Sequence, residues 1–144
     1  MKKIRIFVAS LCFGLSLFAQ DGNAKKLCSS FTDCSSKAEK TDIHRKKIQL
    51  YSEAITNFKS SDGEKNKISI LLKRANSIIK EASGDTGYKG EIALKVTHKP
   101  EYKKQQFDKA REDLNLIEAN LNLLNTNEQT LYESLKSEIN FPNP

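Results

Sequence analysis

The chain has 144 residues and a formal net charge of +6, and 38% of its residues are hydrophobic while none is tryptophan. This size allows one domain with a modest core built mostly of Leu, Ile and Ala. The basic residues are not arranged as a stripe with interleaved aromatic residues, so we expect no binding to nucleic acid.

The first 24 residues are expected to be a secretory signal peptide. Three basic residues among the first five precede an apolar run, 6–19, that is too short to span a membrane. Cleavage is expected after Ala19 or Ala24, and loss of the segment up to Ala19 lowers the net charge from +6 to +3. The mature chain would then be exported to a periplasm, an envelope or the medium, without a transmembrane span. The alternatives are an uncleaved anchor and a lipoprotein attached through Cys12.

Residues 25–40 form a cysteine-containing segment. Cys28 and Cys34 would remain after the signal peptide leaves, and in an oxidising compartment we expect them to form a disulfide. On one continuous helix their Cα atoms would lie about 10 Å apart, beyond disulfide reach. The pair therefore predicts a break in any helix between them. Two free thiols are the alternative, and the spacing without a nearby histidine is a weak signal for a metal site.

The segment from 41 to 59 has the apolar spacing of an amphipathic helix. Thr41 or Asp42 can cap its start, and we expect it to end near Lys59. Its apolar side chains are Ile43, Ile48, Tyr51, Ala54, Ile55 and Phe58.

The strongest helical pattern runs from 64 to 82. Gly63 ends the preceding helix, and Ser61 and Glu64 have the spacing of a capping box. The apolar residues lie on one helical face, and they are Ile68, Leu71, Leu72, Ala75, Ile78, Ile79 and Ala82. We expect this helix to pack as a hairpin against a second apolar stripe, which consists of Phe107, Ala110, Leu114, Ile117 and Leu121.

Between these two stripes, residues 86–106 are expected to form an inserted loop. Ile92, Leu94 and Val96 alternate with other residues as in a short strand or an extended loop. Five lysines against two glutamates give the loop a net charge of +3. We hypothesise that it binds an acidic partner or an anionic surface. The alternative is that its apolar groups pack on the hairpin while its lysines stay in solvent. The candidate contact residues are Tyr88, Lys95, Lys99, Tyr102, Lys103 and Lys104.

Two further helices are expected downstream. Pro100 can open the first of them, which is expected to continue to Leu124. Thr126 and Gln129 have capping-box spacing for the last helix, whose apolar residues are Leu131, Leu135 and Ile139. Residues 141–144 are expected to fray. The fold class is therefore all-α, with about four helices over 41–140.

No residue set indicates catalysis, a cofactor or a metal. His44 in a first helical turn and His98 in a basic loop have no expected partner, so both are interpreted as solvated. Asp108, Glu112 and Asp113 lie among cations on one helix and are interpreted as a solvated, self-paired face. We therefore expect a protein that is not an enzyme, with an enzyme of unrecognised type as the alternative.

The helical segments resemble the tetratricopeptide repeat, a helical hairpin with small residues where its helices touch. Residues 71–80 are similar to its first helix, 107–117 to its second, and 48–55 to the second helix of a preceding repeat. The residues that carry the likeness are Tyr51, Ala54, Leu71, Ala75, Ile78, Phe107, Ala110 and Leu114. Lys47 at a small-residue position and the 86–106 insertion depart from the family pattern. An unrelated helical bundle is the alternative.

The resemblance implies a non-enzymatic module that binds a protein or peptide on the face of its hairpins. The ligand's identity does not follow from it, and homo-oligomers are compatible with it. The alternative from another class is a small structural protein of the envelope, a plain helical bundle that associates through its basic loop.

Overall fold

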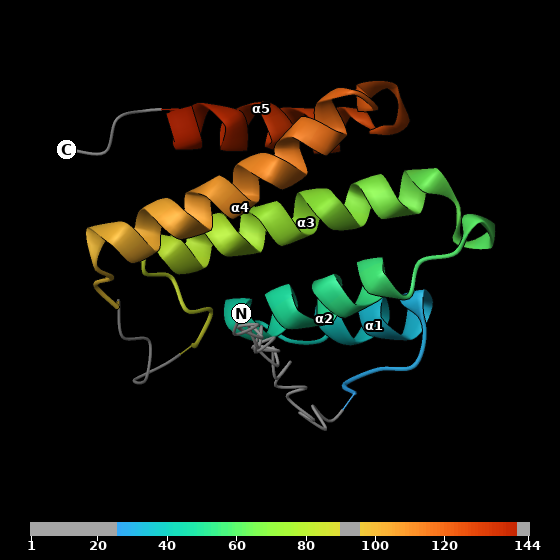
Figure 1. Cartoon of the computed structure of the whole chain (residues 1–144), viewed down its shortest axis with the longest axis horizontal. Helices are drawn as coiled ribbons and strands as arrows, with labels where there is room; N and C mark the ends of the chain where they lie inside the picture. Colours follow the sequence, from blue (N-terminus) through green and yellow to red (C-terminus); the bar gives the residue numbers. More distant parts are fainter. Residues whose placement is uncertain (1–25, 90–95, 141–144) are drawn as a thin grey trace, which may run out of the picture.

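The computed structural model describes residues 26–89 and 96–140, and all regular structure in these two stretches is helical. The α-helices follow one another along the chain (Figure 1), and they are α1 Phe31–Glu39, α2 His44–Thr56, α3 Glu64–Ala82, α4 Pro100–Glu118 and α5 Thr126–Asn140. Two 3-10 turns, η1 Ser60–Asp62 and η3 Leu121–Leu123, precede α3 and α5. The all-α prediction is confirmed for these stretches: the four helices expected over 41–140 are α2 to α5, and α1 is an additional helix before them. The expected signal peptide, 1–24, and tail, 141–144, lie outside the described residues.

The additional helix, α1, lies within the cysteine-containing segment. It begins after Ser30, whose hydroxyl accepts a hydrogen bond from the Asp33 amide at 3.2 Å as an N-cap. The buried residues Phe31, Cys34 and Ala38 are spaced by three and four, which is a single short helical stripe. With so few apolar residues, the helix is too short to be recognised from periodicity alone.

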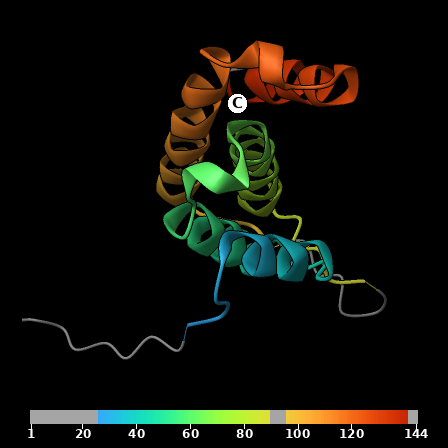
Figure 2. The ribbon, with the colours of Figure 1, turned by 90° about the vertical axis from the view of Figure 1, so that its right-hand side faces the viewer.

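Helix α3 lies at the centre of the domain. It packs most extensively against α4 and α2, while α1 packs on α2 and α5 contacts both α3 and α4. Figures 1 and 2 show α1 and α2 on one side of α3, α5 on the other side, and α4 alongside α3 in the opposite direction. The predicted hairpin of the two central helices is therefore present as α3 and α4.

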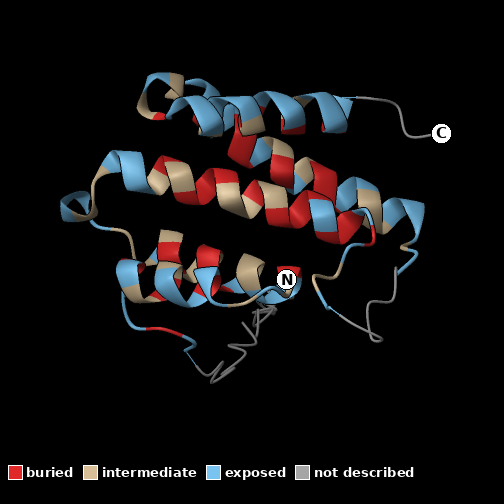
Figure 3. Cartoon of the chain, turned by 180° about the vertical axis from the view of Figure 1, so that it is seen from behind, coloured by how far each residue is buried: buried red, intermediate tan, exposed pale blue. Residues whose placement is uncertain are grey.

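The main hydrophobic core follows the two predicted stripes. Every apolar residue expected to face inward from α3 is buried, as are Phe107, Ala110, Leu114 and Ile117 of α4. Figure 3 shows this buried face along α3. Helix α5 closes the core with Tyr132, Leu135 and Ile139, so the terminal helix covers apolar surface that α3 and α4 would otherwise expose.

A second core joins α1 and α2 to α3. Leu50, Tyr51 and Ala54 of α2 pack with the apolar stripe of α1 and with Ile70 of α3. Leu50 lies outside the predicted apolar face, whereas Ile48 is only partly buried. Helix α2 is buried on two sides because it lies between α1 and α3, and a search for one amphipathic stripe misses that arrangement.

Two predicted helix starts differ from the structure. Helix α2 has Ile43 at its N-cap position, with no side-chain cap, and Thr41 instead accepts the Ile43 amide at 3.3 Å. Helix α3 has Gly63 at its N-cap, with φ of 83°, so Ser61 does not cap it. A positive φ suits glycine because it carries no Cβ. Helix α2 also ends at Thr56, short of the expected boundary near 59.

The predicted continuous helix to Leu124 is wrong, because α4 ends at Glu118. The capping box of α5 lies one residue earlier than expected. The Asn125 side chain accepts the Glu128 amide at 3.0 Å, and the Glu128 carboxylate accepts the Asn125 amide at 3.0 Å. Gln129 instead donates to the carbonyls of Leu121 and Leu124, which fixes the turn between the helices.

The acidic face predicted on α4 is only partly solvated. Asp108 pairs with Lys104 and Arg111 as expected. Asp113 is 1% exposed, and it pairs with Arg74 of α3. The prediction of a solvated Asp113 is therefore wrong, because this carboxylate faces a guanidinium on the neighbouring helix and not the cations of its own helix.

No helix within 26–89 and 96–140 is long and apolar enough to cross a membrane.

Candidate functional site

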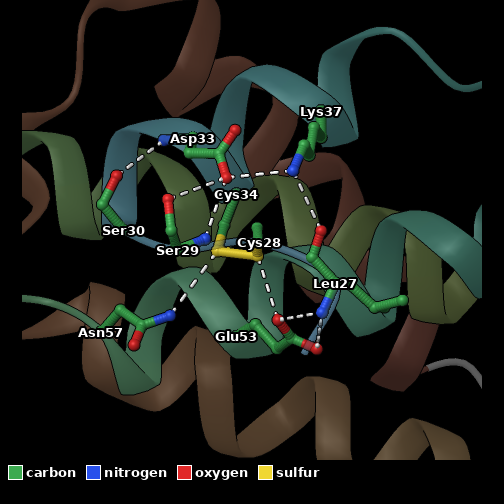
Figure 4. Close-up of polar contacts among 9 residues, drawn as sticks. All are labelled: Leu27, Cys28, Ser29, Ser30, Asp33, Cys34, Lys37, Glu53 and Asn57. Carbon is green, nitrogen blue, oxygen red and sulfur yellow. Dashed lines mark hydrogen bonds and ion pairs between the residues drawn. A yellow bond between two sulfur atoms is a disulfide. The ribbon is translucent and has the colours of Figure 1, made fainter. Parts of the chain in front are cut away.

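The predicted disulfide is present in the structure. The Cys28 and Cys34 sulfur atoms lie 1.96 Å apart, and the Cα atoms are 5.1 Å apart (Figure 4). Cys28 precedes the first residue of α1 and Cys34 lies within α1, so the helix does not run unbroken between them. The bridge ties residues 26–30, which precede the helix, to α1.

Two side chains at the end of α2, Glu53 and the C-cap residue Asn57, contact the bridge (Figure 4). A Glu53 carboxylate oxygen lies 3.0 Å from the Cys28 sulfur, and its two oxygens accept the Leu27 amide at 3.2 and 3.3 Å. Asn57 donates toward the Cys34 sulfur at 3.6 Å. A carboxylate this close disfavours a thiolate at Cys28, since like charges repel. We therefore assign the bridge a structural role.

The same residues include a group with metal-ligand chemistry. Ligand atoms of Cys28, Cys34 and Glu53 lie within 4.8 Å of one another. Both sulfurs are used in the disulfide, however, and metal binding requires thiolates. We therefore assign no metal site to this cluster.

The residues that carry the repeat resemblance are all inside the cores. Ala54, Ala75 and Ala110 are completely buried, and the other five are also buried, namely Tyr51, Leu71, Ile78, Phe107 and Leu114. The Tyr51 hydroxyl donates to Glu39 at 3.0 Å. Burial and this hydrogen bond raise the pKa of Tyr51 above its ordinary range. These residues pack the domain and are not available to a ligand.

The predicted binding loop is divided between a helix and a shorter connection. Helix α4 begins at Pro100, so Tyr102, Lys103 and Lys104 lie on its first turns and the insertion is shorter than 86–106. Lys103 lies over the Phe107 ring and Lys104 pairs with Asp108. Tyr88 and Lys99 remain exposed in the connection, and Lys95 lies outside the described residues together with the expected alternating residues Ile92 and Leu94.

Both ends of this connection are fixed to the domain. The Val96 amide donates to the Gly84 carbonyl at 3.2 Å, and the His44 amide donates to the Thr86 carbonyl at 3.1 Å. Gly87 has φ of 77°, and a Cβ there would lie 1.9 Å from the Asp42 carbonyl oxygen. The chain after α3 thus lies against the start of α2, in an approach that only glycine allows.

A pocket of about 330 Å³ opens where this connection meets the helices. We call it the Glu81 pocket, and it is lined by Ile43, Arg45, Glu81, Thr86, Tyr88, Val96 and His98. Its walls come from the start of α2, the last turn of α3 and both ends of the connection. The pocket is at the lower end of the size range of ligand sites, and it combines apolar walls with a few polar groups.

Glu81 organises the polar side of the pocket. The residue is 5% exposed, and its Oε2 accepts a hydrogen bond from the Tyr102 hydroxyl at 2.7 Å. Its Oε1 lies 3.3 Å from Nη2 of Arg45 and 3.7 Å from Nε2 of His98. Tyr102 is therefore a positioning residue for Glu81, and burial together with this carboxylate raises the pKa of Tyr102.

The interpretation of both histidines as solvated is wrong. His44 is buried, with its Nε2 3.5 Å from Asp85, and His98 is mostly buried against Tyr102, with ring centroids 4.6 Å apart. Two buried ring nitrogens, Nδ1 of His44 and Nε2 of His98, have no hydrogen-bond partner among the described residues. Burial lowers the pKa of His44, because the charged imidazolium loses its hydration.

Sequence reasoning missed Glu81 as a site residue. Glu81 is one of two acidic residues in a lysine-rich helix, where such residues are usually solvated, and its partners Arg45 and Tyr102 lie 36 and 21 residues away. One local signal was available, because Glu81 lies in the last turn of α3. The negative end of the helix dipole disfavours a carboxylate there, so its presence suggests compensation by other groups.

Comparisons with protein-family models, with curated proteins and with solved structures found no match.

Proposed function

We propose that this protein is an exported, non-enzymatic helical-repeat module that binds a protein or peptide ligand at the Glu81 pocket. One observation carries the proposal. Four large apolar side chains of the described residues are notably exposed, and two of them, Tyr88 and Val96, line this pocket. Apolar groups left in solvent at a concave site are typical of a surface that a partner covers.

The arrangement of the helices supports the repeat interpretation. Helices α1 and α2 pack together, α3 and α4 pack together, and α2 contacts α3 between the two pairs. Ala75 of α3 and Ala110 of α4, the small residues of the resemblance, are both completely buried in the core that these helices share. A terminal helix such as α5 can cap an array that is too short to bury its own faces.

The disulfide supports export. A buried bridge next to a carboxylate is suited to an oxidising compartment, where it persists as a structural clip. It agrees with the basic and apolar pattern of the first residues, which is an independent indication of export.

A catalytic role for the Glu81 pocket has little support. Glu81 already accepts a hydrogen bond from Tyr102 and faces Arg45 and His98, so its charge is compensated. The pocket lining contains no serine or cysteine nucleophile beside a base. The geometry favours binding over reaction.

Site-specific photo-crosslinking tests the proposed function. We would place p-benzoylphenylalanine at Tyr88, in the pocket, and at Leu116, a similarly exposed apolar position on α4 outside it. Irradiation in an envelope extract of the expressing cells should yield a specific adduct from the Tyr88 position only. Equal adducts from both positions, or none from Tyr88, would contradict the proposal.

A further inference from the structure

We propose that the ligand of the Glu81 pocket is a peptide segment in which an apolar side chain stands next to a carboxylate. The apolar group would lie between Tyr88 and Val96, and the carboxylate would bind Arg45 and the first turn of α2. This inference rests on the proposed function and specifies its ligand chemistry.

The apolar side chain of the proposed ligand is inferred from the residues that line the pocket. Tyr88 is 50% exposed and Val96 is 42% exposed, and partly buried Ile43 lies on the same lining. Covering such apolar surface releases water and stabilises a complex. The backbone on both sides is held by the hydrogen bonds at Gly84 and Thr86, so the apolar walls are preformed and little ordering is needed on binding.

The carboxylate of the proposed ligand is inferred from Arg45. Its side chain is 71% exposed, whereas Glu81, with which it pairs, is buried. Glu81 accepts a hydrogen bond from one nitrogen of the guanidinium, and Tyr102 interacts with the same group, while most of the Arg45 side chain stays in solvent. A guanidinium has five N–H donors in a fixed fork that matches a carboxylate. Arg45 is thus oriented as a receptor for a second acid.

The start of α2 adds to this preference. Its first turn carries Arg45, Lys46 and Lys47 and no acidic residue. The positive end of the helix dipole makes cations there unfavourable and anions favourable. Among the described residues, Lys46 and Lys47 have no carboxylate within 4 Å, although Asp42 and Glu39 lie close enough to attract Lys47. The amides of Arg45 and Lys46 have no backbone hydrogen-bond partner in that part of the chain, as is usual in a first helical turn. A carboxylate at this position would relieve the repulsion and accept the amides.

The same charges disfavour a cationic ligand. Lys89 is paired with Asp42, and Lys80 and Asp85 both lie near His44. The excess positive charge at this end therefore comes from Lys46 and Lys47 of α2. The one buried acid in the lining, Glu81, already has Tyr102, Arg45 and His98 around it. A basic peptide would have to displace Arg45 from Glu81 and approach Lys46 and Lys47 of α2.

Titrations followed by amide chemical shifts in solution test the inference. The probes are three capped tetrapeptides, acetyl-Gly-Leu-Glu-Gly-amide, acetyl-Gly-Leu-Lys-Gly-amide and acetyl-Gly-Ala-Glu-Gly-amide. Only the Leu–Glu peptide should produce saturable shifts at Thr86, Tyr88 and Val96. The Leu–Lys peptide tests the requirement for a carboxylate, and the Ala–Glu peptide tests the requirement for a large apolar side chain.

Substitutions separate the two halves of the site. Arg45→Gln should weaken binding of the Leu–Glu peptide about tenfold or more, because a charge-assisted hydrogen bond is lost. The affinity of Arg45→Lys for the Leu–Glu peptide should lie between those of the wild type and Arg45→Gln. Lysine keeps the positive charge but lacks the planar guanidinium that can donate two hydrogen bonds to one carboxylate. Lys65→Gln, an exposed cation at the far end of α3, should change nothing. Unchanged shifts outside the pocket would show that the variants remain folded.

The outcomes distinguish this inference from the proposed function. Equal shifts with the Leu–Lys peptide, or unchanged affinity in Arg45→Gln, would overturn the anionic ligand. If Tyr88 forms its specific adduct while no peptide shifts the pocket amides, the binding function stands and this ligand class is wrong. If binding is seen only with vesicles of anionic phospholipid, a membrane surface replaces the peptide and the inference also fails.

Discussion

The Arg74 guanidinium on α3 donates two hydrogen bonds to the Asp113 carboxylate on α4, from Nε to Oδ2 at 2.8 Å and from Nη2 to Oδ1 at 2.5 Å. A third nitrogen, Nη1, donates to the Ser52 hydroxyl of α2 at 3.2 Å. One side chain therefore connects three helices of the domain. Burial raises the pKa of Asp113, although its hydrogen bonds with Arg74 oppose this effect.

Arg74→Met should lower the free energy of unfolding by about 3 to 5 kcal/mol, because it leaves the Asp113 carboxylate buried without a partner. Urea denaturation followed by circular dichroism measures this change. Arg111→Met breaks an exposed pair with Asp108 and should cost about 1 kcal/mol or less. The double variant Arg74→Met, Asp113→Leu should recover most of the loss. A loss below that of the Arg111 control would contradict the assignment.

Removal of the disulfide by Cys28→Ser with Cys34→Ser should lower the stability by about 2 kcal/mol, since the bridge closes a short loop in the unfolded chain. The comparison is denaturation of the oxidised wild type against the double serine variant. Mass spectrometry without reductant should find no alkylatable thiol in the native mature chain. Two alkylated cysteines, or identical stabilities, would show that the bridge does not form or does not contribute.

Ala75→Leu and Ala110→Leu should each destabilise the protein by about 1 to 3 kcal/mol through overpacking. Both alanines are completely buried in the core shared by α3 and α4, so added methylene groups must displace neighbours. Thermal melts measure the effect. Ala119→Leu, at an exposed position just after α4, is the matched control. Unchanged melting of both core variants would favour a loosely packed bundle over a repeat.

The protein should lose stability as the pH falls below about 6.5, the ordinary pKa of histidine. Burial lowers the pKa of His44, and Lys80 and Lys47 act in the same direction while Asp85 opposes them. The unfolded chain therefore binds a proton at a pH where the folded chain does not, so stability rises with pH in this range.

The control for this pH effect is His44→Gln, which should flatten the dependence of stability on pH between about 5 and 6.5. The window is separate from that of Asp85, whose pKa is lowered by the Gly87 amide. Asp85 contributes stability that is lost only in the acid range below the ordinary pKa of a carboxyl. The same slope in wild type and His44→Gln would contradict the role assigned to buried His44.

The two central helices could be predicted because the apolar spacing that defines each of them lies within its own segment of the sequence. Ile68 to Ala82 and Phe107 to Ile117 follow a single helical face, and each such face is buried in the structure. Helix α1 was not predicted because its buried stripe consists of only three residues, too few to define a helical period. Asn125 was not predicted as the N-cap of α5, because Thr126 and Gln129 have the same capping-box spacing one residue later. Asparagine is nevertheless the stronger capping residue.

The pocket could not be predicted because the residues that form it are far apart in the sequence. Arg45, Glu81 and Tyr102 come from three helices, and each alone has the appearance of a surface residue in a charged segment. The histidines were interpreted as solvated because nothing in their neighbourhood indicates that the chain after α3 lies on the start of α2. The insertion was expected to bind a partner through its lysines, whereas the site proposed here uses its exposed apolar ends, Tyr88 and Val96.

Competition at the crosslinking position tests the central claim most directly. The adduct formed by p-benzoylphenylalanine at Tyr88 would be measured with an excess of the Leu–Glu peptide or of the Leu–Lys peptide. If the Glu81 pocket binds an acidic, apolar segment of its partner, the Leu–Glu peptide should suppress the adduct and the Leu–Lys peptide should leave it unchanged. An adduct that neither peptide reduces would contradict the account.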